Sequence, residues 1–227
     1  MFDALQWVEQ IRSDLKPLEK QILGHSYFKA LEEGRLQRDQ LKVFALQQHQ
    51  IISSDLRSIA LIVSRQGLLP SRRFLMNVLQ GEAAALDALH AFADALGLDV
   101  SDLEVLEPLP GAHAYCGFVA WLALYGSDAE LAGGFLINFR AWGANCGRMR
   151  KALHEKYDVA SSALAFFDLF ANMPSFEQEA LGIIQNALNR GVPARLIHQA
   201  ARMLQSYELM FWDAMADAAG VPLDRGA

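Results

Sequence analysis

Carboxylate and amide side chains interrupt several apolar stripes that have helical spacing. Glu208 is the clearest example, because Leu204 and Phe211, about one turn away on either side, are both apolar. A carboxyl group on such a stripe is expected to be buried, and burial raises its pKa toward neutrality. Such a group exchanges protons with a bound molecule, so the pattern predicts general acid/base chemistry at Glu208.

The same pattern recurs in three other segments of the chain. Gln48 and Asp55 fall on the stripe of Ile52, Glu82 falls among leucines, and Asn138 interrupts a stripe between residues 131 and 149. A buried polar group without a partner costs about 1–3 kcal/mol, so each needs a neighbouring side chain, a buried water or a ligand. We expect these groups to line an internal pocket between facing helices, with Glu82 as a second catalytic carboxylate.

The segments that carry these residues are all predicted to be helices. Apolar residues follow helical spacing, Thr is absent from the sequence, and no stretch alternates apolar and polar residues as strands do. The expected fold class is therefore all-α, with about eight helices. Glycine and proline mark the expected breaks at Gly34, Gly67 with Pro70, Gly97, Gly126, Gly191 with Pro193, and Gly220 with Pro222.

Three helix starts are visible in the sequence. Ser71 is predicted to cap the helix that carries residues 74–96, and Ser101 with Glu104 resembles a capping box. Asp128 is predicted to open a segment that runs to His154. The loose stretch before Gly111 is too short for an interdomain linker, so residues 1–227 are expected to form one domain.

Composition excludes several classes of protein. The 227 residues are 52% hydrophobic and 20% charged, with a net charge of -6 and a pI near 5.5, and no basic stripe suits nucleic acid. No apolar run reaches the ~20 residues of a membrane span, and residues 1–10 carry acids and no basic-then-apolar signal, so a cytoplasmic location is expected. Cys116 and Cys146 are too few for a disulfide framework and lack zinc-ligand spacing.

Three sequence motifs resemble one family of helical proteins. They are His25-Ser-Tyr-Phe near the start, Ala129 to Trp142 in the middle, and Glu208-Leu-Met-Phe-Trp-Asp-Ala-Met near the end. In this order they resemble the TenA/thiaminase II (TENA/THI-4) family, with kinship to pyrroloquinoline quinone synthases. The resemblance implies a haem-oxygenase-like multi-helical bundle with a central pocket, used in the family to hydrolyse thiamin fragments.

The resemblance also implies roles for individual residues. Glu208 matches the catalytic glutamate of the family, and Tyr115, Trp142 and Phe170 stand near the positions of its ligand-contacting tyrosines. Asn138 stands where the family has a nucleophilic cysteine, and an amide cannot replace a thiolate in covalent catalysis. Gln48 similarly stands where the family has an aspartate.

Three functions remain open from the sequence. The first is a TenA-type protein that binds a small polar heterocycle, contacted by Gln48, Asp55, Tyr115, Asn138, Trp142 and Phe170, and hydrolyses it with Glu208 and Glu82. The second is an oxidase of a small molecule, and the third is a non-catalytic ligand-binding or regulatory protein. Glu82 and His90 alone are too few ligands for a di-iron site, so we predict no metal and no cofactor.

The partners predicted from the sequence are a small-molecule ligand and further copies of the chain. Neither nucleic acid nor a membrane is expected as a partner. Aromatic residues near Trp7 and Trp121 are expected to be exposed and to support a homo-oligomer.

Overall fold

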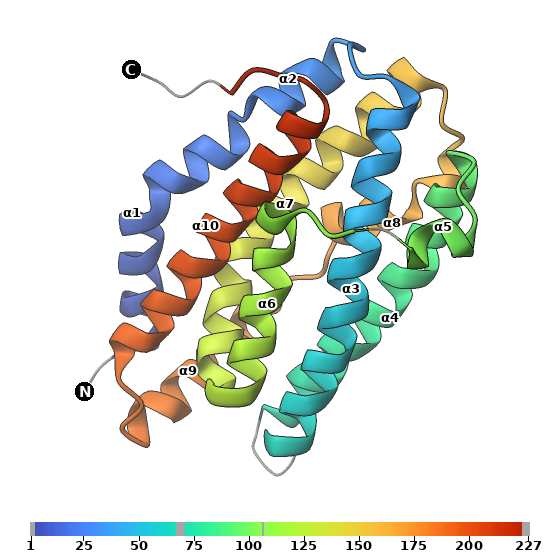
Figure 1. Ribbon diagram of the computed structural model, residues 1–227. Coiled ribbons are helices and arrows are strands. Elements are labelled where there is room, and N and C mark those ends of the chain that lie inside the picture. Colours follow the sequence, from blue (N-terminus) through green and yellow to red (C-terminus); the bar gives the residue numbers. More distant parts are fainter. Residues whose placement is uncertain (1–2, 67–70, 106, 224–227) are drawn as a thin grey trace.

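The structure, a computed structural model, describes residues 3–66, 71–105 and 107–223. These residues form ten α-helices and one short 3₁₀ helix and no strand (Figure 1), which confirms the all-α class. The elements are α1 (Ala4–Leu23), α2 (Ser26–Glu32), α3 (Arg38–Gln66), α4 (Arg72–Ala95), α5 (Val100–Glu104), α6 (Pro110–Tyr125), α7 (Asp128–Tyr157), η1 (Ser161–Ala163), α8 (Ala165–Ala171), α9 (Glu177–Asn189) and α10 (Ala194–Ala218).

The expected number of helices, about eight, is too low for the described residues. Four of the expected glycine breaks have positive φ, namely Gly34, Gly97, Gly191 and Gly220. Gly67 and Pro70 lie outside the described residues. The additional helices are short: α2 begins where the His25 side chain accepts a hydrogen bond from the backbone of Tyr27, and α8 begins after η1. No glycine or proline separates η1 from α8, so the sequence gives no signal for that break.

The three predicted helix starts need correction in detail. Ser71 precedes α4 but makes no side-chain capping bond, because its own backbone is already helical instead of extended. The capping box of α5 is formed by Asp99 with Asp102, two residues before the predicted pair. Helix α7 is capped by Ser127 paired with Glu130, so the cap is the residue before Asp128.

Six helices form a closed ring around the middle of the molecule. Helix α3 packs against α4, α4 against α8, α8 against α7, α7 against α10, α10 against α6, and α6 against α3. Figure 1 shows α3 and α4 side by side and α10 beside α6. Helices α1, α2 and α9 cover the outside of α7 and α10. The polar residues singled out in the sequence come from the ring helices, so their inward faces can meet.

Close helix packing fixes one side of this ring. Gly133 and Gly134 lie in α7, and a Cβ atom on Gly134 would lie 2.7 Å from Leu204 Cδ1 of α10. A Cβ atom on Gly133 would likewise meet Ile197 of α10. The adjacent glycines therefore let α7 and α10 approach closely.

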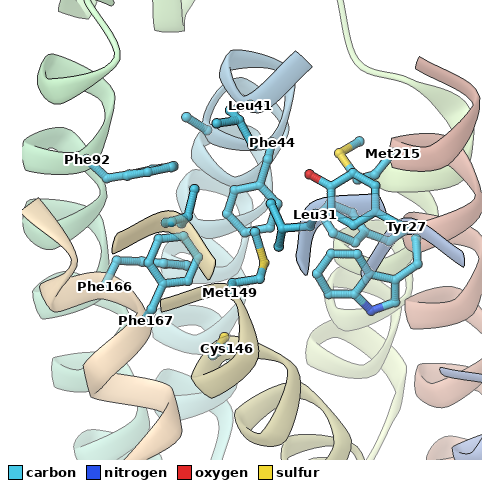
Figure 2. Close-up of a cluster of buried hydrophobic side chains, with 14 of the residues drawn as sticks. Tyr27, Leu31, Leu41, Phe44, Phe92, Cys146, Met149, Phe166, Phe167 and Met215 are labelled. Carbon is cyan, nitrogen blue, oxygen red and sulfur yellow. The ribbon is translucent and has the colours of Figure 1, made fainter. Parts of the chain in front are cut away.

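An aromatic cluster packs one half of the interior. Phe44 of α3 lies at its centre in Figure 2, with Phe166 and Phe167 on one side and Tyr27 on the other. The Phe44 ring centroid is 5.6 Å from that of Phe167. Such pairs add about 0.5–1.5 kcal/mol beyond the burial of their area. A second apolar cluster fills the other half, and the half-buried Tyr115 packs against both.

No helix among the described residues is long and apolar enough to cross a membrane.

Candidate functional site

The inner cavity lies inside the ring of helices and has a volume of about 40 Å³. All eight residues predicted as catalytic or ligand-binding line it, although their roles remain predictions. Four apolar residues that were not predicted as site residues complete the wall. The lining residues are Gln48, Ile51, Ile52, Asp55, Glu82, Tyr115, Asn138, Phe139, Trp142, Phe170, Glu208 and Phe211.

A chain of hydrogen bonds orders one side of the inner cavity. The Tyr115 hydroxyl donates to Asn138 Oδ1 at 2.9 Å. Asn138 Nδ2 then donates to Glu208 Oε2 at 2.6 Å, and Trp212 Nε1 donates to Glu208 Oε1 at 3.1 Å. The bonds from Tyr115 through Asn138 to Glu208 run in one direction, because the amide of Asn138 accepts at its oxygen and donates at its nitrogen. The bond from Trp212 meets them at Glu208 from the other end. We call Tyr115, Asn138, Glu208 and Trp212 the Glu208 side.

Glu208 keeps a proton at neutral pH. Only 2% of the residue is exposed. Burial raises its pKa from 4.5 to about 8, against the opposing effect of the hydrogen bonds from Trp212 and Asn138. Each carboxylate oxygen already accepts one hydrogen bond, so the carboxyl proton is free to be donated to a molecule in the cavity.

Asp55 and Glu82 form a second group of carboxyls, which we call the acidic pair. Asp55 comes from α3 and Glu82 from α4, and both side chains are buried. Burial, together with the charge of Glu82, raises the pKa of Asp55 well above its usual value. Burial alone raises the pKa of Glu82 to about 7. Two carboxyls placed together in this way do not both ionise at neutral pH.

The aromatic residues form the remaining wall of the inner cavity. The rings of Trp142 and Phe170 meet edge to face with centroids 5.8 Å apart, and Phe170 meets Phe139 at 6.3 Å. Phe170 is carried by the end of α8. This end lies directly against α7, where Gly143 leaves room for it: a Cβ atom at Gly143 would lie 2.8 Å from Phe170 O. Faces and edges of these rings suit contact with a planar ligand.

Two parts of the site escaped the sequence analysis. Trp212 was quoted only as part of a motif, although its position four residues after Glu208 places both on one helix face. Phe139 was missed because it follows Asn138 directly and gives no periodic signal. His49, which follows Gln48 directly, is absent from the cavity wall, and its ring lies 5.6 Å from that of His90.

Metal ligands do not gather in the part of the chain that the structure describes. No group of three or more His, Cys, Asp or Glu side chains there is arranged to hold a metal ion. Cys116 and Cys146 are buried free thiols, and burial raises the pKa of both.

The fold and the site together define an all-α bundle with an internal cavity between six helices, and solved structures share the fold of this bundle. A domain of unknown function from Shewanella denitrificans OS217 with a haem-oxygenase-like fold superposes with a TM-score of 0.71 at 13% identity, covering 92% of this chain and 90% of that one. The haem-oxygenase-like fold expected from the sequence is thereby confirmed.

The family follows from the sequence profile. The profile of the TENA/THI-4/PQQC family matches residues 12–218, and the chain belongs to this family. A TenA homologue from Pseudomonas syringae pv. tomato DC3000 is 17% identical, with a TM-score of 0.76 and 93% of each chain covered. A TenA homologue from P. horikoshii OT3 is also 17% identical, with a TM-score of 0.72, covering 93% of this chain and 99% of that one. No curated protein sequence matches this chain.

Proposed function

We propose that the protein binds a small, planar, polar heterocycle of the thiamin-fragment type in the inner cavity and hydrolyses it with Glu208 as acid and base. One observation carries the proposal: Glu208 is buried at the end of an ordered hydrogen-bond chain and lines a cavity walled by aromatic rings. Family membership supports the same class of ligand.

The chemical step uses the proton that Glu208 holds near neutral pH. Glu208 donates this proton to the leaving nitrogen of the ligand while the oxygen of a water molecule forms the new bond to carbon. The carbon–nitrogen bond breaks, the amine leaves, and the attacking water returns a proton to Glu208. Asn138 fixes the orientation of the Glu208 carboxyl group and takes no covalent part, because an amide is a poor nucleophile.

The other cavity residues bind the ligand in this proposal. Gln48 is buried in the wall and offers both a donor and an acceptor to ring nitrogens and their substituents. Trp142 and Phe170 provide apolar surface for the ring. Glu82 is the second carboxylate that exchanges protons with the ligand.

Ring binding requires the aromatic wall to move. The inner cavity measures about 40 Å³, whereas an apolar cavity of about 150 Å³ accommodates benzene. Phe139 and Phe170 are only partly buried, and both also line a neighbouring outer cavity. Rotation of these two rings toward the outer cavity would enlarge the inner one enough for a six-membered ring.

The test is binding and turnover of thiamin and its aminopyrimidine fragments. We expect calorimetric binding, product formation detected by mass spectrometry, and a crystal structure with the ring between Gln48 and Glu208. Glu208→Gln should retain binding and lower kcat by about 10²–10⁴-fold. Glu155→Gln, at an exposed position of α7, is the matched control and should behave as wild type. Absence of binding by every one of these compounds would contradict the proposal.

A non-catalytic binder is the second candidate function. Asn138 stands where the family has its nucleophile, and its oxygen and nitrogen each make one hydrogen bond, to Tyr115 and Glu208 respectively. Tight binding of an aminopyrimidine with no product after prolonged incubation would favour this candidate over the hydrolase.

We further propose a homo-oligomer. The outer face of α6 exposes Trp121, Leu124 and Tyr125, whose exposed fractions are 44%, 50% and 71%. Trp7, by contrast, is half-buried and donates to Ala194 O at 3.0 Å, so its predicted exposure is wrong. Light scattering on the eluting protein should give a multiple of 25.1 kDa, whereas a monomer would contradict the proposal.

A further inference from the structure

The acidic pair lies in the inner cavity without a positively charged side chain beside it among the described residues. Asp55 is only 4% exposed and lines the inner cavity, yet its Oδ1 has no hydrogen-bond partner among the described residues. A buried, unpartnered carboxyl oxygen is costly, so it requires an explanation beyond packing.

No cationic side chain lines the inner cavity in the described part of the chain. The titratable groups that face the pair from other helices are Tyr115 and Cys116 of α6 and Glu208 of α10. All are neutral or anionic groups. The wall residues of α7 and α8 carry no charge at all. The protein therefore supplies three carboxyl groups to one cavity and no positive charge to balance them.

The acidic pair is also placed where a ligand can reach it. An outer cavity of about 750 Å³ lies between α4, α7, α8 and α9, and it shares Glu82, Phe139 and Phe170 with the inner cavity. Most of its other lining residues are apolar, including Phe74, Val78, Met173, Pro174 and Phe176. Glu82 thus stands at the junction of the inner cavity and a larger outer one.

We propose that the ligand is an aromatic organic cation whose protonated amine is held by Asp55 and Glu82, with its ring at the wall that the two cavities share. The amine supplies the donors that Asp55 Oδ1 lacks and the positive charge that the cavity lacks. This inference rests on the proposed function, since it specifies the charge of a ligand bound in the same cavity.

Binding of such a cation is coupled to proton release. Burial keeps at least one proton on the acidic pair near neutral pH, and an ammonium group favours the ionised form of both carboxyls. Affinity should therefore rise between pH 6 and pH 8 as the pair becomes easier to ionise. Burial raises the pKa values of Tyr115 and Cys116, so neither titrates in this range. Glu208, with a pKa of about 8, begins to ionise at the upper end of the range, and Glu208→Gln removes its contribution.

The test compares benzylamine with benzyl alcohol, which has the same shape without the charge. Calorimetry at pH 8 should show benzylamine binding at least tenfold more tightly, and more weakly at pH 6, whereas benzyl alcohol should bind equally at both. Asp55→Asn and Glu82→Gln should each remove this preference. Asp87→Asn, at an exposed position of the same helix as Glu82, should keep it.

The outcomes separate this inference from the proposed function. Equal affinity for benzylamine and benzyl alcohol, beside measurable binding of an aminopyrimidine, would overturn the inference and leave the proposed function standing. Preference for benzylamine that survives in both Asp55→Asn and Glu82→Gln would also overturn it. If neither the aromatic probes nor the aminopyrimidines bind, both proposals are wrong. Glu208→Gln separates the two proposals further. It should lower turnover but keep the pH-dependent preference for benzylamine over benzyl alcohol.

Discussion

On one side of the inner cavity, Glu208 accepts hydrogen bonds from Asn138 and Trp212, whereas across the ring Asp55 Oδ1 has no partner among the described residues. Burial raises the pKa of the carboxyls on both sides. The carboxyl groups on the two sides are therefore both buried, but only Glu208 is held in place by hydrogen-bond donors of the protein. A carboxyl held by fixed donors is oriented for proton transfer, and one without donors is suited to acquire them from a ligand.

The largest expected effect comes from breaking the hydrogen bonds of the Glu208 side. Asn138→Leu keeps the number and branching of the side-chain heavy atoms but leaves the Tyr115 hydroxyl and Glu208 Oε2 without partners. We expect the free energy of unfolding to fall by about 2–4 kcal/mol at pH 6, measured by urea denaturation. Asn172→Leu, at an exposed position, is the control. A loss below about 1 kcal/mol would mean that the chain does not stabilise the fold.

Removing charge from the acidic pair should have the opposite sign. Glu82→Gln is expected to raise the free energy of unfolding at pH 8 by about 1–2 kcal/mol, because it removes a buried charge and the repulsion of that charge with Asp55. At pH 5 Glu82 is protonated in the folded protein, so the substitution should be nearly neutral there. Equal destabilisation at both pH values would show that Glu82 is held by partners, as Glu208 is.

The dependence of stability on pH follows from the raised pKa values. Glu208 and Glu82 have folded pKa values of about 8 and about 7, above their ordinary 4.5. The stability that these raised pKa values contribute is complete below pH 4.5. It is lost as the pH rises from 4.5 through 7 for Glu82 and through 8 for Glu208. Each group contributes up to about 1.4 kcal/mol per pH unit in this window.

Thermal denaturation between pH 5 and pH 8.5 measures this slope directly. The wild-type Tm should fall as the pH rises, and Glu208→Gln and Glu82→Gln should each give a shallower decrease. Glu155→Gln should follow the wild-type curve. A Tm that stays constant or rises across this range would contradict the burial of uncharged carboxyl groups.

The smallest effect is expected at Trp212, the buried member of the Glu208 side that lies in the aromatic cluster. Trp212→Phe removes one hydrogen bond to Glu208 Oε1 while retaining an aromatic ring in the cluster. That hydrogen bond lowers the pKa of Glu208, so its loss should shift the pKa upward. An NMR titration of the Glu208 carboxyl carbon measures the shift, and a downward shift would show that Trp212 acts otherwise.

The helical period explains why the sequence already indicated the cavity wall. Residues three or four apart share a helix face, so Gln48 and Asp55 had to point with Ile52, and Glu208 with Phe211. The family motifs added Tyr115, Trp142 and Phe170. These two signals together pointed to eight residues that the fold brings to one cavity.

The contacts between helices were beyond the reach of the same reasoning. Asp55 and Glu82 lie on separate helices, and their pairing depends on how α3 and α4 pack. The order of hydrogen bonds from Tyr115 to Glu208 likewise depends on three helices meeting at specific angles. Short helices such as α8 were missed because too few residues are present to show a period.

The central claim is that Glu208 holds its proton at neutral pH while its hydrogen-bond chain orients it. A ¹³C NMR titration of protein labelled at the glutamate carboxyl carbons tests this most directly, with Glu208→Gln to assign the signal. We predict one carboxyl that titrates with an apparent pKa of about 8 and disappears in the variant. A Glu208 carboxyl that titrates near the ordinary value of 4.5 would contradict the account.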